Sequence, residues 1–275
     1  MSFRKSLWLT VTVCAALSST SALATNYHGN NSIVVANNEA GVAATGTLMN
    51  YLENLPTSPS DSETGWMPGF SAKYSLMGDY FPAVENLYFS VNYQFSSGNI
   101  AYKGGYIGTP GVLDSTTGET TNRVVARIGK AFSLSRNIML TPYIAGGYQG
   151  WNRKLSSSEV EDYSAELAGI GAKLQYALNR RMVFGVGAEW LAILGGSMTP
   201  HIAQFRDLGV AGFDVSGEEK VGFNADYRIS GPFHIYGGVN YTHFNYTGGL
   251  LNGGFFEPSS ATNLLGMNLG LAYAF

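Results

Sequence analysis

The chain has 275 residues, of which 45% are hydrophobic, only 13% are charged, and 35 are glycine. Its formal net charge of −3 argues against nucleic acid as a partner. Beyond residue 24 no run of roughly 18 apolar residues occurs, so a helical membrane protein is excluded.

Residues 1–24 have the three parts of a secretory signal peptide. A basic start is followed by a short apolar core and by small residues that end in Ala22-Leu-Ala24. This core is shorter than the roughly 20 apolar residues of a membrane anchor. Cleavage removes Cys14, the only cysteine, and leaves 14 basic residues against 19 acidic ones over residues 25–275. We therefore expect an exported protein that is stabilised without disulfides.

Apolar residues alternate with small or polar residues in ten segments of the mature chain. Such alternation is typical of β-strands with one apolar face, and turn residues separate the segments. In chain order the segments cover about 40–52, 66–78, 86–95, 122–134, 138–150, 162–177, 181–194, 219–229, 233–246 and 265–275. In the last segment one face carries only Gly, Asn and Ala, and the other carries Leu265, Met267, Leu269, Leu271, Tyr273 and Phe275.

The connections between these segments alternate in length. Short turns lie at 79–85, 135–137, 178–180 and 230–232, and longer connections lie at 98–120, 151–161, 195–217 and 247–262. This regular asymmetry is typical of a transmembrane barrel with short periplasmic turns and long extracellular loops. The segments also reach the roughly 9–11 residues that a tilted strand needs to cross a membrane.

A sheet that crosses lipid must close on itself, because lipid offers no hydrogen bonds to the backbone. Both termini then lie in the periplasm, which requires an even number of strands. If the weak segment at 40–52 is counted as a strand, the chain has ten strands. If this segment and its partner are left out, it has eight. We predict an all-β protein, a closed antiparallel transmembrane β-barrel of ten strands over residues 40–275, with eight strands as the alternative. Residues 25–39 would form an N-terminal periplasmic tail.

Aromatic residues gather near the ends of the predicted strands, with smaller aliphatic residues between them. They are Trp66, Tyr93, Phe95, Phe132, Tyr148, Tyr176, Trp190, Tyr227, Phe233, Tyr241, Tyr273 and Phe275. Aromatics favour any strand, but their position at the ends favours two girdles at the membrane interfaces.

The faces opposite the apolar ones carry charges that we expect to point into the lumen. They are Lys73, Arg123, Arg127, Lys173, Arg181, Glu189, Lys220, Asp226 and Arg228. An Arg or Lys that faces lipid at mid-depth costs roughly 2–4 kcal/mol, which enforces the inward orientation. Lys130 alone falls on the outer face, where it would snorkel toward the periplasmic surface or mark a bulge. The set predicts an ion-paired plug, which we favour for a small barrel, or a pore lining with cationic bias.

The signal peptide, the alternating segments and the terminal Tyr273-Ala-Phe275 together resemble the outer-membrane β-barrel proteins of Gram-negative bacteria. In that class a terminal aromatic preceded by alternating apolar residues is similar to the signal read by the barrel-assembly machinery. The segment L-T-P-Y-I-A-G-G-Y-Q-G-W at 140–151 further resembles the opacity or surface-antigen type. The resemblance implies an outer-membrane location, contact with outer-membrane lipid and lipopolysaccharide, and assembly by that machinery. A host or surface ligand is a further candidate partner.

The sequence offers little for catalysis. None of the four histidines, His28, His201, His234 and His243, is followed two residues later by the serine that a lipid-A deacylase of this architecture would lead us to expect. The paired aspartates and Asp–His couple of omptin proteases are not evident either, since Asp226 and His234 are expected near the periplasmic end. Two short G-x-G segments lack the third glycine of a dinucleotide fingerprint. We expect no enzyme activity, no cofactor and no metal.

The predicted outside segments are acidic. They contain Glu53, Asp61, Glu63, Asp114, Glu119, Glu159, Glu161, Asp162, Asp207, Asp214, Glu218, Glu219 and Glu257. Such acids keep loops solvated, and they could also bind divalent cations or ions associated with lipopolysaccharide. The predicted function is structural or surface interaction through these acidic loops. A narrow porin-like channel for small solutes is the alternative, and a membrane-embedded hydrolase is a distant one.

Overall fold

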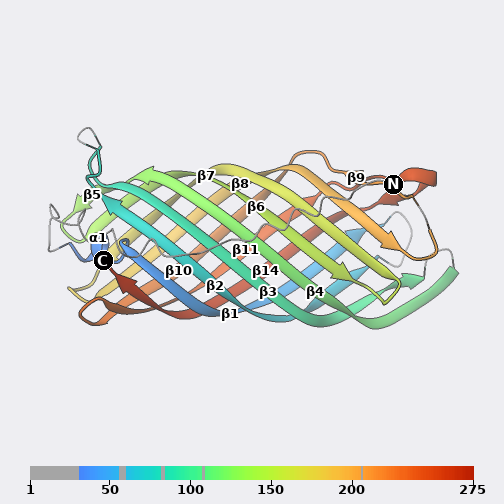
Figure 1. Ribbon diagram of the computed structural model, residues 1–275, viewed down its shortest axis with the longest axis horizontal. Coiled ribbons are helices and arrows are strands. Elements are labelled where there is room, and N and C mark those ends of the chain that lie inside the picture. Colours follow the sequence, from blue (N-terminus) through green and yellow to red (C-terminus); the bar gives the residue numbers. More distant parts are fainter. Residues whose placement is uncertain (1–30, 56–59, 82–83, 107–108, 206) are drawn as a thin grey trace, which may run out of the picture.

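The computed structural model describes residues 31–55, 60–81, 84–106, 109–205 and 207–275 (Figure 1). The predicted signal peptide lies outside the described residues, and so does the predicted periplasmic tail up to residue 30. Within these ranges no helix has the length and apolar character needed to cross a membrane.

Ten long antiparallel strands form the wall of a closed barrel in the described part of the chain. They are β1 (Glu39–Asn54), β2 (Ser62–Gly78), β3 (Leu87–Tyr106), β4 (Thr109–Lys130), β6 (Ile138–Lys154), β7 (Glu159–Ala177), β8 (Met182–Ile202), β10 (Ser216–Ser230), β11 (Phe233–Tyr246) and β14 (Ser259–Ala274). Consecutive strands pair around the wall, and β14 pairs back to β1 with Glu39 opposite Ala274. The prediction of a closed ten-stranded barrel is confirmed. The eight-stranded alternative is wrong, because β1 pairs along its whole length with β14.

Short elements lie at the two ends of the barrel. We call the end that carries the C-terminus the proximal end and the opposite end the distal end (Figure 1). The proximal elements are helix α1 (Ser32–Val35) and β5 (Phe132–Ser135). The distal elements are β9 (Ala211–Gly212), β12 (Gly249–Leu250), the 3-10 turn η2 (Asn252–Gly254) and β13 (Phe256–Glu257).

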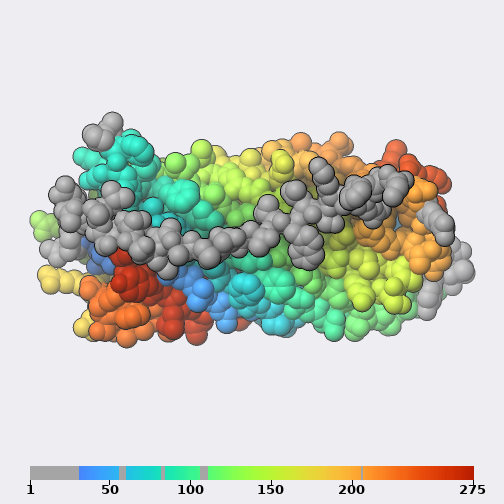
Figure 2. All heavy atoms as spheres, viewed as in Figure 1, coloured from blue at the N-terminus to red at the C-terminus, as the bar shows by residue number. Residues whose placement is uncertain are grey.

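Exposed apolar side chains form a belt around the proximal part of the wall. On β14 the exposed residues are Leu265, Met267, Leu269, Leu271 and Tyr273, whereas the inward-facing Ala272 and Ala274 are buried. Aromatic residues edge the belt on its distal side, at Trp66, Tyr148, Trp190 and Tyr241. Beyond the belt polar residues are exposed on the strands, as at Thr64, Asn122 and Glu219, with single apolar residues such as Leu52 and Val112 among them. Figure 2 shows the elongated body, with the last strands in red and orange beside the blue first strand near the proximal end.

Beyond the apolar belt the strands continue as a distal extension, where the sequence predicts long loops. Residues 98–106 and 109–120 are a paired continuation of β3 and β4, with Lys103 opposite Asp114. In the same way β6 continues to Lys154 and β8 to Ile202. The predicted bounds of these loops are too wide, because outside an apolar belt neither face of a strand must be apolar, although long connections remain after β8 and after β11. Strand pairing therefore continues where the apolar alternation ends.

Candidate functional site

The segment before β1 closes the proximal end of the lumen. Asn31 caps α1, because its side chain accepts a hydrogen bond from the backbone N–H of Ile33 at 3.0 Å. Ile33 and Val34 are buried in a cluster that also contains Met77, Tyr88, Ala131, Met139, Ala177 and Val183. Apolar side chains on such a short helix have nowhere else to be buried, so packing in the lumen fixes its position.

Two asparagines tie this segment to the wall. Asn37 Nδ2 donates to Gln175 Oε1 at 2.8 Å, and Asn38 Nδ2 donates to the carbonyl of Met77 at 2.7 Å. We call residues 31–38 the proximal plug. These residues, expected to be part of a periplasmic tail, fold into the lumen, and β1 begins at Glu39 rather than at residue 40.

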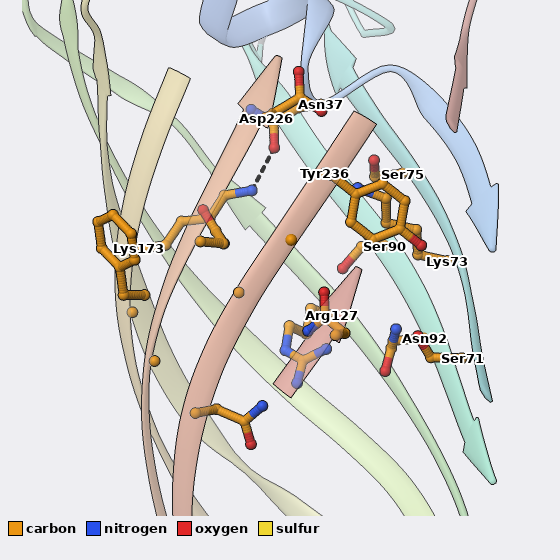
Figure 3. A pocket seen from close by; sticks show the side chains of 18 of the residues that line it. Asn37, Ser71, Lys73, Ser75, Ser90, Asn92, Arg127, Lys173, Asp226 and Tyr236 are labelled. Atoms are coloured by element: carbon orange, nitrogen blue, oxygen red, sulfur yellow. Dashed lines mark hydrogen bonds between the residues drawn. The ribbon is translucent and has the colours of Figure 1, made fainter. Parts of the chain in front are cut away.

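A chamber of about 310 Å³ lies in the lumen next to the proximal plug. Lys73, Arg127 and Lys173 reach into it from β2, β4 and β7 (Figure 3). Arg127 makes two hydrogen bonds with Glu189, at 2.5 and 2.9 Å, and Lys73 Nζ lies 2.6 Å from Glu39 Oε1. These two charge-assisted ion pairs cross the chamber among uncharged polar side chains such as Ser90 and Asn92.

The chamber wall nevertheless carries more cations than anions. Lys173 Nζ donates to Asn37 of the proximal plug and lies 3.9 Å from the centroid of the Tyr88 ring. Lys220 also lines the chamber. Arg123 lies further toward the distal end, where it binds both carboxylate oxygens of Glu218 at 2.6 Å. The lumen in this region is therefore crowded with paired charges and positive on balance.

Arg153 is the centre of a second seal in the distal extension. Its guanidinium is 1% exposed and donates to Glu53, Glu63 and Glu161 at 2.7, 2.8 and 2.9 Å. The guanidinium carbon also lies 4.8 Å from the centroid of the Tyr51 ring, within range of a cation–π contact. A fully buried arginine of this kind needs several acceptors, because an unpaired buried charge is strongly destabilising.

Aromatic rings fill the lumen around Arg153. Trp151 and Tyr163 stack with ring centroids 4.7 Å apart, and Tyr163 stacks on Tyr246 at 5.7 Å. Tyr51 meets Trp151 edge-on at 5.2 Å. We call Arg153, its three carboxylate partners and these rings the distal seal.

The distal seal contains more carboxyl groups than cations. The carboxylate of Glu119 accepts from the Trp151 indole N–H, and Glu257 of β13 accepts from the Tyr163 hydroxyl at 2.6 Å. Burial raises the pKa of Glu53 to about 7, and burial together with the nearby Glu63 raises the pKa of Glu119 to about 8. Burial also raises the pKa of Glu257 well above its usual range. Several of these groups therefore keep their protons near neutral pH, which limits the repulsion between them.

Most of the charges predicted to face the lumen line it. Those that line internal cavities are Lys73, Arg123, Arg127, Lys173, Glu189, Lys220 and Asp226. Arg181 and Arg228 are exposed at the proximal rim, where Arg228 Nε donates to the carbonyl of Gly231 at 2.8 Å. The wall ends at this rim, so their side chains reach solvent. Lys130 lies at the same end, with Nζ 5.5 Å from the centroid of the exposed Phe132 ring.

Sequence reasoning placed the acids of the distal seal in outside loops, and this was wrong. The acids that are buried in the structure are Glu53, Glu63, Glu119, Glu161, Glu218 and Glu257. Arg153, the partner of Glu53, Glu63 and Glu161, is not singled out by the sequence at all. The alternation of side chains along the strands indicates that these acids point inward. Glu218 lies on the same face as Lys220, and Glu53 lies on the same face as the buried Tyr51.

The histidines with acidic partners lie at opposite ends of the barrel. His234 Nδ1 lies 2.6 Å from Asp226 Oδ1, buried near the proximal end on the neighbouring strands expected for them. His201 Nε2 lies 3.0 Å from Asp162 Oδ2 on the exposed surface of the distal extension. The predicted terminal residues Tyr273 and Phe275 are exposed beside the belt, and the Phe275 ring stacks on Tyr74 with centroids 5.6 Å apart.

No protein-family model matches the chain, and no curated protein matches its sequence. Solved structures do match its fold. The outer membrane protease OmpT from Escherichia coli matches with a TM-score of 0.52 at 12% identity, over 87% of this chain and 97% of that one. The transport unit of the autotransporter AIDA-I from Escherichia coli gives a TM-score of 0.48 at 12% identity, over 90% and 98% of the two chains. The outer membrane protein OprG from Pseudomonas aeruginosa gives 0.36 at 10% identity, over 86% and 96%.

The match to OmpT concerns the fold, because 12% identity carries no information about activity. It agrees with the closed antiparallel wall that the pairing of β1 with β14 completes. The chain thus has the fold of a Gram-negative outer-membrane β-barrel, closed by ten antiparallel strands.

Proposed function

We propose that the protein resides in the outer membrane and serves a structural or surface-interaction role through its distal extension, with a lumen that does not conduct. In this orientation the apolar belt lies in the hydrocarbon layer and the proximal end faces the periplasm. The distal extension then stands outside the cell. The cleaved signal peptide and the opacity or surface-antigen type belong to this proposal.

The observation that carries the proposal is the presence of two independent seals in one lumen. A solute would have to displace the proximal plug, with Ile33 fully buried, and then the distal seal around Arg153. Breaking a buried ion pair by removing one partner costs roughly 3–5 kcal/mol, so spontaneous opening of the distal seal is rare. Solute could pass through the chamber between the two seals, as the channel alternative requires, only if both seals opened together.

The surface role rests on what the distal extension exposes. Six of the predicted loop acids are buried, and those left exposed on the extension are Asp114, Asp162, Asp207, Asp214 and Glu219. Exposed carboxylates of this kind bind divalent cations that neutralise lipopolysaccharide, and they repel other anionic surfaces. Lipopolysaccharide and a host or surface ligand are the partners we propose for this region.

Recording from single molecules in a planar bilayer tests the sealed lumen. We expect the wild-type protein to leave the membrane silent. Steady conductance that changes in Arg127→Gln would support the channel alternative and contradict the sealed lumen. Refolded protein with heat-dependent mobility in a denaturing gel serves as the control that the silent sample is folded.

Cells that display the protein test the surface role. The connection 203–215 between β8 and β10 is replaced by a short Gly-Ser linker, which leaves the wall of the barrel intact. We expect weaker attachment of these cells to extracellular matrix or host cells. Equal attachment of both cell types, at equal surface amounts of folded barrel, would remove this connection from the proposal.

A further inference from the structure

Three buried side chains from three strands meet at the proximal end of the lumen. Glu39 begins β1, Asp226 lies on β10 and His234 on β11. One nitrogen or oxygen atom from each of them lies within 4.8 Å of the corresponding atoms of the other two. Only β14 separates β11 from β1, and its residues opposite His234 and Glu39 are alanines, so no large side chain of β14 stands between them.

Each of these side chains has an atom without a hydrogen-bond partner among the described residues. The atoms are Glu39 Oε2, Asp226 Oδ2 and His234 Nε2. Glu39 and His234 are each only 2% exposed. A buried polar atom that is left unpaired costs roughly 1–3 kcal/mol, so native proteins rarely gather three of them in one place.

The charge of the cluster is also unbalanced. Among the described residues one cation, Lys73, forms an ion pair with one of the two carboxylates, with its Nζ 2.6 Å from Glu39 Oε1, whereas the arginines of the proximal rim form none with them. The formal charges of the two carboxylates and Lys73 leave one negative charge uncompensated in a region shielded from solvent. A bound divalent cation would compensate it, and a buried uncompensated charge is strongly disfavoured.

We propose that Glu39, Asp226 and His234 form a binding site for a divalent first-row transition-metal ion, such as Zn²⁺. An imidazole nitrogen and two carboxylate oxygens are the donors that these ions accept, and Mg²⁺ and Ca²⁺ prefer oxygen donors alone. The contact of 2.6 Å between His234 Nδ1 and Asp226 Oδ1 brings two potential ligand atoms together, and an ion bound by both would replace the hydrogen that they share. Bound metal would link β1, β10 and β11 across the strand that closes the barrel.

A route to this site leads from the proximal rim. A small crevice there is lined by Asp226 and His234 together with Ser32, Val35, Arg180, Arg181, Val183 and Arg228. Asp226 also lines the chamber, so it lies between the crevice and the lumen. The arginines place positive charge at the entrance, and we therefore expect the ion to bind slowly and to require long incubation.

Metal content of the purified, folded protein tests the proposal. The full chain is prepared without a polyhistidine tag, treated with EDTA, incubated with Zn²⁺ and freed of loose metal by gel filtration. We expect about one zinc per chain in the wild-type protein and at least a tenfold lower content in His234→Asn and in Glu39→Gln. The matched control His201→Asn replaces an exposed histidine at the other end and should retain the wild-type content.

Two further measurements keep the test decisive if the variants fold poorly. Co²⁺ bound by the wild-type protein should give the intense visible absorption of a low-coordinate site, and Zn²⁺ should remove it. Zn²⁺ should also raise the temperature of unfolding, whereas the same concentration of Mg²⁺ should not. A wild-type protein that retains no zinc after long incubation overturns the proposal, and so does equal retention by His234→Asn.

Discussion

In the proximal half of the lumen charged groups meet in pairs around a chamber, whereas the distal half is filled by aromatic rings and an excess of carboxyl groups. Arg127 and Glu189 represent the first arrangement, and Arg153 with three glutamates represents the second. The difference follows from what surrounds each half. Around the proximal half the apolar side chains are on the outside, so the inward face receives small and polar residues. The distal extension has a polar exterior, and large rings can therefore lie inside.

The largest expected effect comes from breaking the distal arrangement at its centre. Arg153→Ala leaves three buried carboxyls without their cation, and we expect it to lower the free energy of unfolding by about 3–5 kcal/mol. Denaturant unfolding followed by tryptophan fluorescence measures this change, since Trp151 lies in the distal seal. Lys154→Ala, at the exposed neighbouring residue, is the matched control and should change the value by less than about 0.5 kcal/mol. Equal values for the two variants would contradict the role of Arg153.

A rise in pH should destabilise the distal half, and we expect this effect to be smaller than that of Arg153→Ala. The pKa of Glu53 is raised to about 7 and that of Glu119 to about 8, from an ordinary 4.5, so folding favours their protonated forms. The contribution of these two groups to the free energy of unfolding is present in full below pH 4.5. It is lost as the pH rises through 7 for Glu53 and then through 8 for Glu119. Each pKa unit corresponds to about 1.4 kcal/mol, and relaxation of the site reduces this, so we expect a loss on the order of 2 kcal/mol.

Hydrogen exchange of the distal strands at increasing pH, corrected for the intrinsic rates, measures this loss. Glu119→Gln removes one of the titrating groups while keeping its size. The variant should therefore show a flatter dependence on pH than the wild-type protein. An unchanged slope would mean that Glu119 does not titrate in the folded state as its surroundings indicate.

The smallest effect on stability is expected at the outer edge of the proximal half. Phe275→Ala removes an exposed ring that stacks on Tyr74, and we expect a loss of less than about 1 kcal/mol in refolded protein. If the ring also serves as an assembly signal, the amount of folded barrel in cells should fall much further. Heat-dependent gel mobility measures both, with Phe256→Ala, an exposed aromatic at the distal end, as the control. Parallel losses in cells and in refolded protein would argue against an assembly role.

The proximal half could be predicted from the sequence because the apolar belt imposes a strict alternation. Leu269 and Leu271 are exposed and Ala272 is buried, as the period of two requires. The same rule placed Asp226 beside His234 on adjacent strands, which the register of β10 and β11 reproduces.

The distal half could not be predicted in the same way. Its strands have polar outer faces, so Glu53 and Glu119 look like loop residues unless the alternation is continued past the last apolar side chain. The proximal plug could not be predicted for a different reason. Ile33 and Val34 lie in a single helical turn, which is too short to show the apolar periodicity of a helix. Their burial depends on contacts with residues such as Met139, more than 100 positions away in the sequence.

The pairing of β1 with β14 has a consequence for how the molecule is made. Glu39 finds its backbone partner in Ala274, and the amide of Phe275 donates to the carbonyl of Asn38 at 3.0 Å. The first strand to be synthesised must therefore wait, with one edge bare, until nearly all of the remaining polypeptide has followed it. A bare edge attracts other strands and invites aggregation. We therefore expect the chain to be most vulnerable before β14 reaches this edge, and a prematurely terminated chain would have no strand to cover it.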